Sequence, residues 1–182
     1  MPEHVTAVLN NDWFGAPEAA RPSFELVCAD GIVRLAAHVA QAPLIVPGDT
    51  GGFVEGLWEG DCAELFLANP ATGYYLEFNL SPQGAWWCCE FTAPRVRAAG
   101  APRALAGVRT TGAAEAGSWR ASIDIPVASL PAALAFVPAT TRGNVTFCLG
   151  CEPQRYLTHV DLGGGRPDFH RPDRWVPLFD GN

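Results

Sequence analysis

The sequence contains no lysine, a single methionine and no long uninterrupted hydrophobic segment. All twelve basic residues are arginines, and nineteen acidic residues bring the formal net charge to -7. Proteins that bind nucleic acids neutralise phosphates with clustered cationic side chains. The only loose cluster here consists of Arg95, Arg97, Arg103 and Arg109. We therefore expect no nucleic-acid partner.

No apolar segment approaches the roughly 20 residues that a membrane-spanning helix needs. The first residues, MPEHVTAVLNNDW, also lack the basic segment and apolar core of an export signal. These two absences predict a cytoplasmic protein without a membrane partner. In that compartment the six cysteines are expected to be reduced.

The chain has 182 residues, of which 48% are hydrophobic. A chain of this size buries roughly 70% of the surface that its unfolded form exposes, so it can fold without a metal or disulfide framework. The composition shows no internal break, and we interpret residues 1–182 as one domain.

Sixteen prolines and nineteen glycines interrupt the chain at short intervals, and the segments between them alternate in hydropathy with a period of two. This pattern predicts about seven to nine β-strands. In the segment 23–39, Asp30-Gly31 is typical of a two-residue hairpin turn. Pairing outward from this turn places Phe24, Leu26 and Cys28 on one face with Val33, Leu35 and Ala37.

The segments 62–69, 74–81 and 85–92 predict a three-stranded meander. Leu76, Phe78 and Leu80 define its core face, so Glu77 and Asn79 must lie on the opposite face. The turn at 81–84 resembles a type I turn with a bulge, which shifts the register by one residue. Whether Trp86 or Trp87 shares the face of Glu77 therefore stays open.

Further strands are predicted at 119–125, 144–151 and 156–160. The only candidate helix, at 126–136, is limited by Pro131 to a turn or two. We therefore predict an all-β fold with little helix, an antiparallel two-sheet β-sandwich of the jelly-roll or immunoglobulin-like kind.

The cysteines offer two adjacent pairs, Cys148 with Cys151 and Cys88 with Cys89. Residues that are adjacent or three apart on a strand point to opposite faces, so neither pair converges on one metal ion. We predict thiols that pack as small core side chains, with no metal site and no cofactor.

Signatures of covalent catalysis and phosphate binding are missing. There is no G-x-S-x-G motif, and the glycines at 163–165 lack the lysine and hydroxyl residues of a phosphate-binding loop. Glu64 and Glu77 on neighbouring strands could act as paired carboxylates in glycoside hydrolysis. Solvated strand carboxylates are the commoner explanation.

Aromatic and polar side chains of the predicted outer face form a combination that suits a sugar. A sugar ring packs its C–H face on an aromatic ring, and its hydroxyl groups bond carboxylate, amide and guanidinium groups. Near the C-terminus, prolines 167 and 172 stiffen a loop that presents Asp168, His170 and Arg171. We expect Asp168-Phe169-His170 to form a structural clasp in which Phe169 is buried and the two polar side chains hydrogen-bond to nearby backbone.

Three segments, LWEGDCAELFL (57–67), YLEFNLSPQGAW (75–86) and PDFH (167–170), resemble bacterial DOMON-like domains, which are related to family-nine carbohydrate-binding modules. The resemblance implies a β-sandwich that binds sugar or, in other branches, haem. Haem-binding relatives use a methionine and histidine pattern, and the only methionine here is Met1, so we expect no haem.

In the sugar-binding branch two tryptophans enclose a terminal sugar, and this resemblance assigns the platforms to Trp58 and Trp175. It also implies that Glu77, Asn79 and Arg95 bond the hydroxyl groups. Together with the residue patterns, it gives the predicted ligand-binding set: Trp58, Glu64, Tyr75, Glu77, Asn79, Trp86, Arg95, Asp168, His170 and Trp175.

The sequence thus predicts a non-catalytic module that binds a small polar ligand, most simply a sugar or the end of a glycan. A glycan-active enzyme that uses Glu64, Glu77 and His170 is one alternative. A sandwich that binds a partner protein through exposed aromatic residues is another. A concave pocket near Glu77 would favour the first two, and a flat apolar patch would favour the third.

Overall fold

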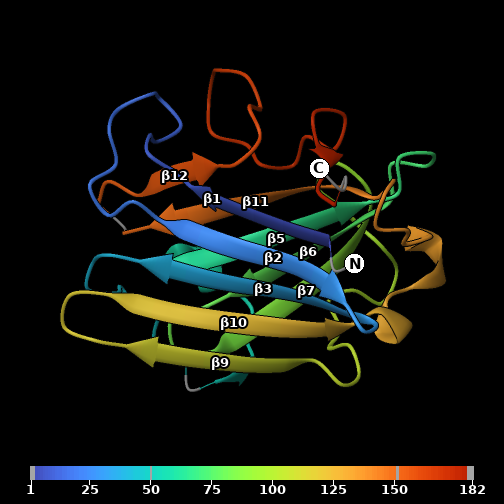
Figure 1. Ribbon diagram of the computed structural model, residues 1–182, viewed down its shortest axis with the longest axis horizontal. Coiled ribbons are helices and arrows are strands. Elements are labelled where there is room, and N and C mark those ends of the chain that lie inside the picture. Colours follow the sequence, from blue (N-terminus) through green and yellow to red (C-terminus); the bar gives the residue numbers. More distant parts are fainter. Residues whose placement is uncertain (1–2, 50, 151, 180–182) are drawn as a thin grey trace.

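A computed structural model of the protein describes residues 3–49, 51–150 and 152–179. Its strands form two sheets that stack face to face, as Figure 1 shows with the five-stranded sheet in front. This arrangement confirms the predicted all-β sandwich. Met1 and Cys151 lie outside the described residues.

The first sheet has the strand order β1-β2-β3-β10-β9, and all of its neighbours are antiparallel. Its strands are β1 (Glu3–Val8), β2 (Ser23–Ala29), β3 (Ile32–Val39), β10 (Trp119–Pro126) and β9 (Arg109–Ala114).

The second sheet has the order β12-β11-β5-β6-β7-β4, with β13 paired to β11 and β8 paired to β7. Its pairs are antiparallel except that of β4 with β7, which is parallel. Its strands are β12 (Arg155–Thr158), β11 (Arg142–Leu149), β5 (Cys62–Ala68), β6 (Tyr75–Leu80), β7 (Ala85–Ala93), β4 (Gly52–Phe53), β13 (Val176–Pro177) and β8 (Val96–Arg97).

The hairpin register predicted around Asp30-Gly31 is confirmed. Both residues have positive φ, 51° and 74°, and Leu26 lies opposite Leu35. The described residues form thirteen strands rather than seven to nine, because β1 was not predicted and three strands have only two residues. The predicted helix is replaced by two short 3-10 turns, η2 (Val127–Ser129) and η3 (Ala132–Leu134), since Pro131 interrupts the segment.

The turn at 81–84 settles the register that the sequence left open. Gly84 takes a positive φ of 86°, and Leu80 lies opposite Trp86. Trp86 therefore faces the first sheet, and Trp87 lies on the other face with Asn79. The predicted separation of Leu76, Phe78 and Leu80 from Glu77 and Asn79 is confirmed.

The second sheet is buried on both faces. One hydrophobic cluster fills the space between the two sheets, and a second lies on the outer face of β5, β6, β7 and β11. The outer cluster is completed by side chains of loops, among them Leu57, Val160, Leu162, Phe169 and Trp175. Burial on the outer face is unusual for an antiparallel sheet, whose outer face is commonly solvated.

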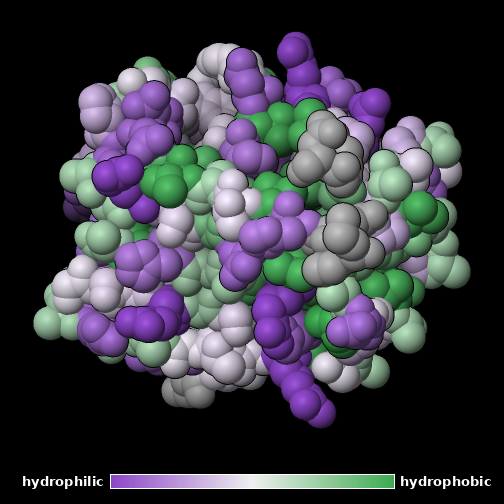
Figure 2. All heavy atoms as spheres, viewed as in Figure 1, coloured by the Kyte–Doolittle hydropathy of each residue, from purple (hydrophilic) through white to green (hydrophobic). Residues whose placement is uncertain are grey.

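The outer face of the first sheet has a different character. Polar residues such as Glu25, Arg34 and His38 alternate with the inward apolar ones, and hydrophilic and hydrophobic side chains are interspersed in Figure 2. Within residues 3–49, 51–150 and 152–179, no helix is long and apolar enough to cross a membrane.

The two sheets also meet at one edge, where β9 supports the turn between β6 and β7. The Thr110 hydroxyl donates to the Gly84 carbonyl at 2.6 Å, and a Cβ added to Gly112 would lie 2.3 Å from the Gln83 carbonyl carbon. Only glycine fits at position 112 without moving backbone.

We therefore expect Gly112→Ala to lower the free energy of unfolding by about 1–3 kcal/mol, the usual effect of overpacking. Gly117→Ala is the matched control, because a Cβ at Gly117 would meet no heavy atom within 4 Å. Urea denaturation of both variants measures the difference. Equal stability of the two variants would contradict the close packing described for Gly112.

Candidate functional site

A cavity of about 330 Å³ opens on the outer face of the second sheet. Its floor is formed by strand residues, and its walls come from the β7–β8 hairpin, the 3-10 turn η1 (Leu57–Glu59), β12 and the loop that precedes β13. The lining residues are Trp58, Glu64, Glu77, Trp87, Phe91, Arg95, Arg97, Cys148, Tyr156, Pro167, Asp168, Phe169 and His170.

Two carboxyl groups lie at the floor because strand alternation directs them there. Glu64 on β5 lies opposite Asn79 on β6, and Glu77 lies opposite Phe66. Their strand neighbours Leu65 and Leu76 face the first sheet, so the glutamates must face outward. Loops cover this face, and Glu64 and Glu77 are only 3% and 5% exposed.

Neutral hydrogen-bond donors hold both carboxyl groups. Asn79 Nδ2 donates to Glu77 Oε1 at 2.8 Å, and Thr146 Oγ1 donates to Glu64 Oε2 at 2.7 Å. Burial raises the pKa of both carboxyl groups. The negative charge of Glu64 raises the pKa of Glu77 further. The two carboxyl groups at the floor of the cavity therefore keep their protons to a higher pH than exposed carboxyl groups do.

His170 presents a nitrogen donor to the same floor. Burial and, to a smaller extent, the positive charge of Arg95 lower its pKa to about 4, so the ring is neutral near pH 7. The Tyr75 hydroxyl accepts the backbone N–H of Arg95 at 3.0 Å and lies 2.7 Å from His170 Nδ1. Burial raises the pKa of Tyr75, which keeps this hydroxyl protonated and able to donate to Nδ1.

The proton of the neutral imidazole is then on Nε2. Nε2 lies 3.6 Å from Glu77 Oε2, which is longer than a hydrogen bond. This N–H and the carboxyl group are thus neighbouring groups that can both bond a molecule in the cavity.

The loop at 167–170 forms one wall and behaves as the predicted clasp in part. Phe169 is buried and packs against Trp13 and Tyr156, with ring centroids 6.0 Å apart in both cases. Asp168 accepts the backbone N–H of His170 at 3.1 Å and pairs with Arg95 at 2.7 Å. His170 bonds a side chain, that of Tyr75, rather than the backbone that was predicted.

Trp58 forms another wall, and two glycines fix the turn that carries it. Gly56 has a φ of 90°, and a Cβ on Gly60 would lie 2.7 Å from the Leu44 carbonyl oxygen. The carbonyl of Trp58 accepts the side-chain amide of Gln154 at 2.6 Å. The indole ring of Trp58 is half-buried and packs edge to face on Trp87 at 5.2 Å.

Trp87 provides a donor without a partner. Its side chain is 1% exposed, and its indole Nε1 has no hydrogen-bond acceptor in the described part of the chain. The guanidinium of Arg97 lies over its ring at 5.3 Å and pairs with Glu55 at 2.5 Å. A buried N–H without an acceptor is costly, so this indole is a strained point of the cavity wall.

The structure brings most of the predicted site residues together. Six of them line the cavity: Trp58, Glu64, Glu77, Arg95, Asp168 and His170. Tyr75 and Asn79 lie behind the lining and position His170 and Glu77 through the hydrogen bonds given above.

The structure places two predicted residues elsewhere. Trp86 faces the inter-sheet core, because the turn at 81–84 sets the register of β7. Trp175 is 1% exposed and packs on Phe66 and Tyr75 in the outer cluster, so it does not line the cavity. Trp87 takes the place that was predicted for Trp86.

Several lining residues were missed, and one signal could have found Tyr156. The segment 156–160 is predicted as a strand, and assigning Leu157 to the core directs Tyr156 outward. Leu157 does lie opposite Phe147, in the inner cluster. Phe91 and Arg97 are placed in the cavity wall by the register of β7 and by its bulge between Phe91 and Ala93. The sequence predicted neither that register nor the bulge.

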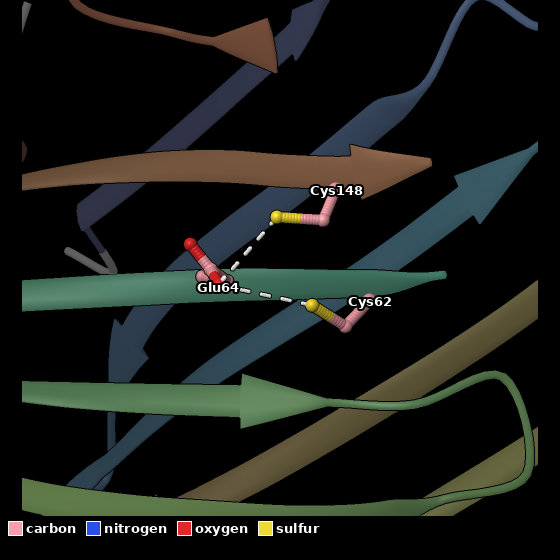
Figure 3. A group of neighbouring side chains, drawn as sticks. All are labelled: Cys62, Glu64 and Cys148. Atoms are coloured by element: carbon pink, nitrogen blue, oxygen red, sulfur yellow. Dashed lines mark hydrogen bonds between the residues drawn. The ribbon is translucent and has the colours of Figure 1, made fainter. Parts of the chain in front are cut away.

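The residues that could hold a metal ion lie at the same floor. Cys62, Glu64 and Cys148 each offer one ligand atom, and these atoms lie within 4.8 Å of one another. Figure 3 shows Glu64 between the two sulfur atoms. Cys62, Cys88, Cys89 and Cys148 carry free thiols, whereas Cys151 of the predicted pair lies outside the described residues.

Comparison with known proteins finds similarity at the level of the fold. A protein from Bacteroides uniformis that is proposed to bind carbohydrate superposes with a TM-score of 0.71 at 21% identity, over 94% of this chain and 84% of that one. A family-nine carbohydrate-binding module from Caldicellulosiruptor kristjanssonii in complex with cellotriose superposes with a TM-score of 0.56 at 13% identity, over 97% and 80%.

The same module in complex with glucose superposes with a TM-score of 0.56 at 12% identity, over 96% of this chain and 81% of that one. No protein-family model and no curated protein sequence matches the chain. The predicted resemblance to family-nine modules is therefore supported as a likeness of fold, and the DOMON-like assignment stays a prediction.

The burial of Phe169 predicts a large effect of its truncation. Phe169→Ala should lower the free energy of unfolding by about 3–5 kcal/mol, as truncations of buried aromatic side chains do. Phe14 is 73% exposed, and Phe14→Ala should change stability by no more than about 0.5 kcal/mol. Chemical denaturation gives both values. A Phe169→Ala variant as stable as Phe14→Ala would show that the loop does not anchor the wall.

The buried carboxyl groups predict that stability falls as pH rises. Because folding raises their pKa, the folded protein binds more protons than the unfolded chain. The free energy of unfolding that these protons contribute is lost as the pH rises through the pKa of the folded state. The lowered pKa of His170 acts in the opposite sense, but below about pH 6.5. The thermal midpoint should therefore decrease between about pH 6.5 and 8.5.

Glu77→Gln should reduce this decrease, because it removes one of the two groups. Each tenfold change in an acid constant corresponds to about 1.4 kcal/mol, and about 1 kcal/mol shifts the midpoint by about 2–4 °C in a chain of this size. Glu25→Gln, on the exposed face of the first sheet, is the control. If Glu77→Gln keeps the full pH dependence of the wild type, Glu77 is not the responsible group.

Proposed function

We propose that this protein binds a sugar or the end of a glycan in the cavity above Glu64 and Glu77, and that it performs no chemistry on the ligand. The observation that carries the proposal is the cavity itself. It combines two buried carboxyl groups, a neutral imidazole N–H and exposed guanidinium groups with walls of Trp58, Trp87, Tyr156 and Phe169.

The size of the cavity favours a small ligand. Ligand sites commonly enclose about 300–1,000 Å³, and the 330 Å³ here lie at the lower limit. A single ring unit is therefore enclosed, and the remainder of a longer chain would extend into solvent. This supports recognition of an end rather than of the middle of a polymer.

The walls and the floor suit different parts of a sugar. Trp58 is half-buried, so part of its indole is available to the C–H face of a ring. At the floor, a Glu77 carboxyl oxygen accepts a hydrogen bond from a hydroxyl group while His170 Nε2–H donates to a hydroxyl oxygen. A hydroxyl group is both donor and acceptor, so it matches this mixture.

The charges of the cavity favour a neutral ligand. Arg95 is paired with Asp168 and Arg97 with Glu55, so neither guanidinium is an unpaired cation that would select a phosphate. Glu64 and Glu77, deeper in the cavity, add no positive charge that would bind an anion. A polyhydroxylated neutral molecule fits this balance, and the solved neighbours of similar fold include modules in complex with cellotriose and glucose.

The first test is a screen of the wild-type protein on a broad glycan array, followed by calorimetry on each ligand that binds. Loss of a hydrogen bond to an ionised carboxylate removes roughly 1.5–3 kcal/mol, so at a pH above the raised pKa of Glu77 the change Glu77→Gln should weaken binding about ten- to a hundredfold. Trp58→Ala should weaken it at least as much. Glu25→Gln, outside the cavity, should bind like the wild type.

The outcomes separate the three function classes. Saturable binding without turnover on aryl glycosides supports the binding module. Turnover that Glu64→Gln and Glu77→Gln abolish would instead identify a glycan-active enzyme using Glu64, Glu77 and His170. A wild type that binds nothing on the array would contradict the proposal and leave a protein-interaction role. Cytoplasmic location and DOMON-like ancestry remain parts of the same proposal.

A further inference from the structure

Three side chains that could bind a metal ion meet at the floor of the cavity, and they come from two strands, β5 and β11. Cys62 and Glu64 are two residues apart on β5, so their side chains share the outer face of the sheet. Cys148 on β11 lies directly opposite Cys62. Spacing along a single strand misses this convergence, because the two cysteines meet only through strand pairing.

The three side chains point at one another. Cys62 Sγ and Cys148 Sγ each lie 3.8 Å from the same oxygen, Glu64 Oε1. Figure 3 shows these two contacts converging on Glu64 from β5 and β11. In a tetrahedral zinc site, Zn–S and Zn–O bonds of about 2.3 and 2.1 Å place sulfur and oxygen about 3.6 Å apart. The observed separations need only a small adjustment.

The surroundings hold these groups in place. Thr146 Oγ1 donates to Glu64 Oε2 at 2.7 Å, which leaves Oε1 for the cation. The Asn79 amide oxygen lies 3.8 Å from Cys62 Sγ. Hydrogen-bonded partners of this kind orient the ligands of metal sites. Cys62, Glu64 and Cys148 are all at most 3% exposed, so bulk water does not compete for them.

A cation would also compensate Glu64. Its Oε1 accepts only two thiol contacts in the described residues, and thiols are weak donors. A carboxylate that is buried with weak donors is costly unless a proton or a cation neutralises it. Two thiolates and one carboxylate form a soft, anionic donor set, which is typical of Zn²⁺ rather than of Mg²⁺ or Ca²⁺.

We propose that Cys62, Cys148 and Glu64 bind one Zn²⁺ ion at the floor of the cavity. On binding, the sulfur of each cysteine, and Glu64 where it is protonated, exchanges its proton for a bond to zinc, and the protons pass to the solvent; no electron is transferred. Glu64 and Cys148 line the cavity, so an ion bound there is reached from it. Three protein ligands leave a fourth position for water or a ligand oxygen.

The test uses the reduced, metal-free protein and Zn²⁺ alone, with no sugar present, so its result is independent of the proposed function. Equilibrium dialysis with metal analysis should give one Zn²⁺ per chain. Titration with Co²⁺ should give the thiolate-to-cobalt charge-transfer absorption that carboxylate or histidine sites lack.

Cys62→Ser and Cys148→Ser should each weaken Zn²⁺ binding by more than the roughly 10–100-fold that loss of a supporting residue costs. Glu64→Gln should weaken binding while keeping the charge-transfer band. Cys89→Ser is the matched control, because Cys89 is buried on the same face of the same sheet but lies outside the group. It should bind Zn²⁺ like the wild type.

Circular dichroism of each variant establishes that it is folded before its affinity is compared. Absence of stoichiometric Zn²⁺ in the folded wild type would overturn the proposal. Equal loss of affinity in Cys89→Ser and Cys62→Ser would overturn it as well, because Zn²⁺ binding would then not depend specifically on Cys62, Cys148 and Glu64.

Discussion

The structure depends on the burial of the second sheet on both of its faces. An antiparallel sheet needs only one covered face, and the inner cluster provides that cover against the first sheet. Here loops cover the outer face as well, and strand alternation places carboxyl, amide and thiol groups beneath them. The altered pKa values, the hydrogen-bond network and the cavity all follow from closing polar side chains into this layer.

The covering layer is held by contacts that are specific rather than merely apolar. Asp61, at the start of β5, accepts the backbone N–H of Gly150 and the indole N–H of Trp119 on the first sheet, at 2.7 and 3.1 Å. Tyr75 connects β6 to both Arg95 and His170. The bonds of Asp61 join the second sheet to the first, and those of Tyr75 tie the walls of the cavity to its floor. The lining side chains are thus positioned before a ligand arrives, which lowers the entropic cost of binding.

Local patterns of the sequence predicted the fold and the floor of the site. The alternation in 75–80 determined the face of Glu77 and Asn79, and Asp30-Gly31 determined the register of the first hairpin, because both depend on neighbouring residues alone. The positions of Trp175 and Cys62 could not be predicted from local sequence patterns. Trp175 is removed from the cavity by packing on Tyr75, and Cys62 meets Cys148 through pairing of strands far apart in the chain. Neither contact leaves a periodic signal.

The separation of floor and walls has a consequence for how such a protein can diverge. The floor residues alternate with the inter-sheet core, so an insertion of one residue in β5 or β6 would exchange the two and disrupt folding. The walls are carried by loops and a short hairpin, which tolerate changes of length and sequence. Selection could therefore exchange one wall for another and alter which molecule is accepted, while the chemistry at the bottom of the cavity stays the same.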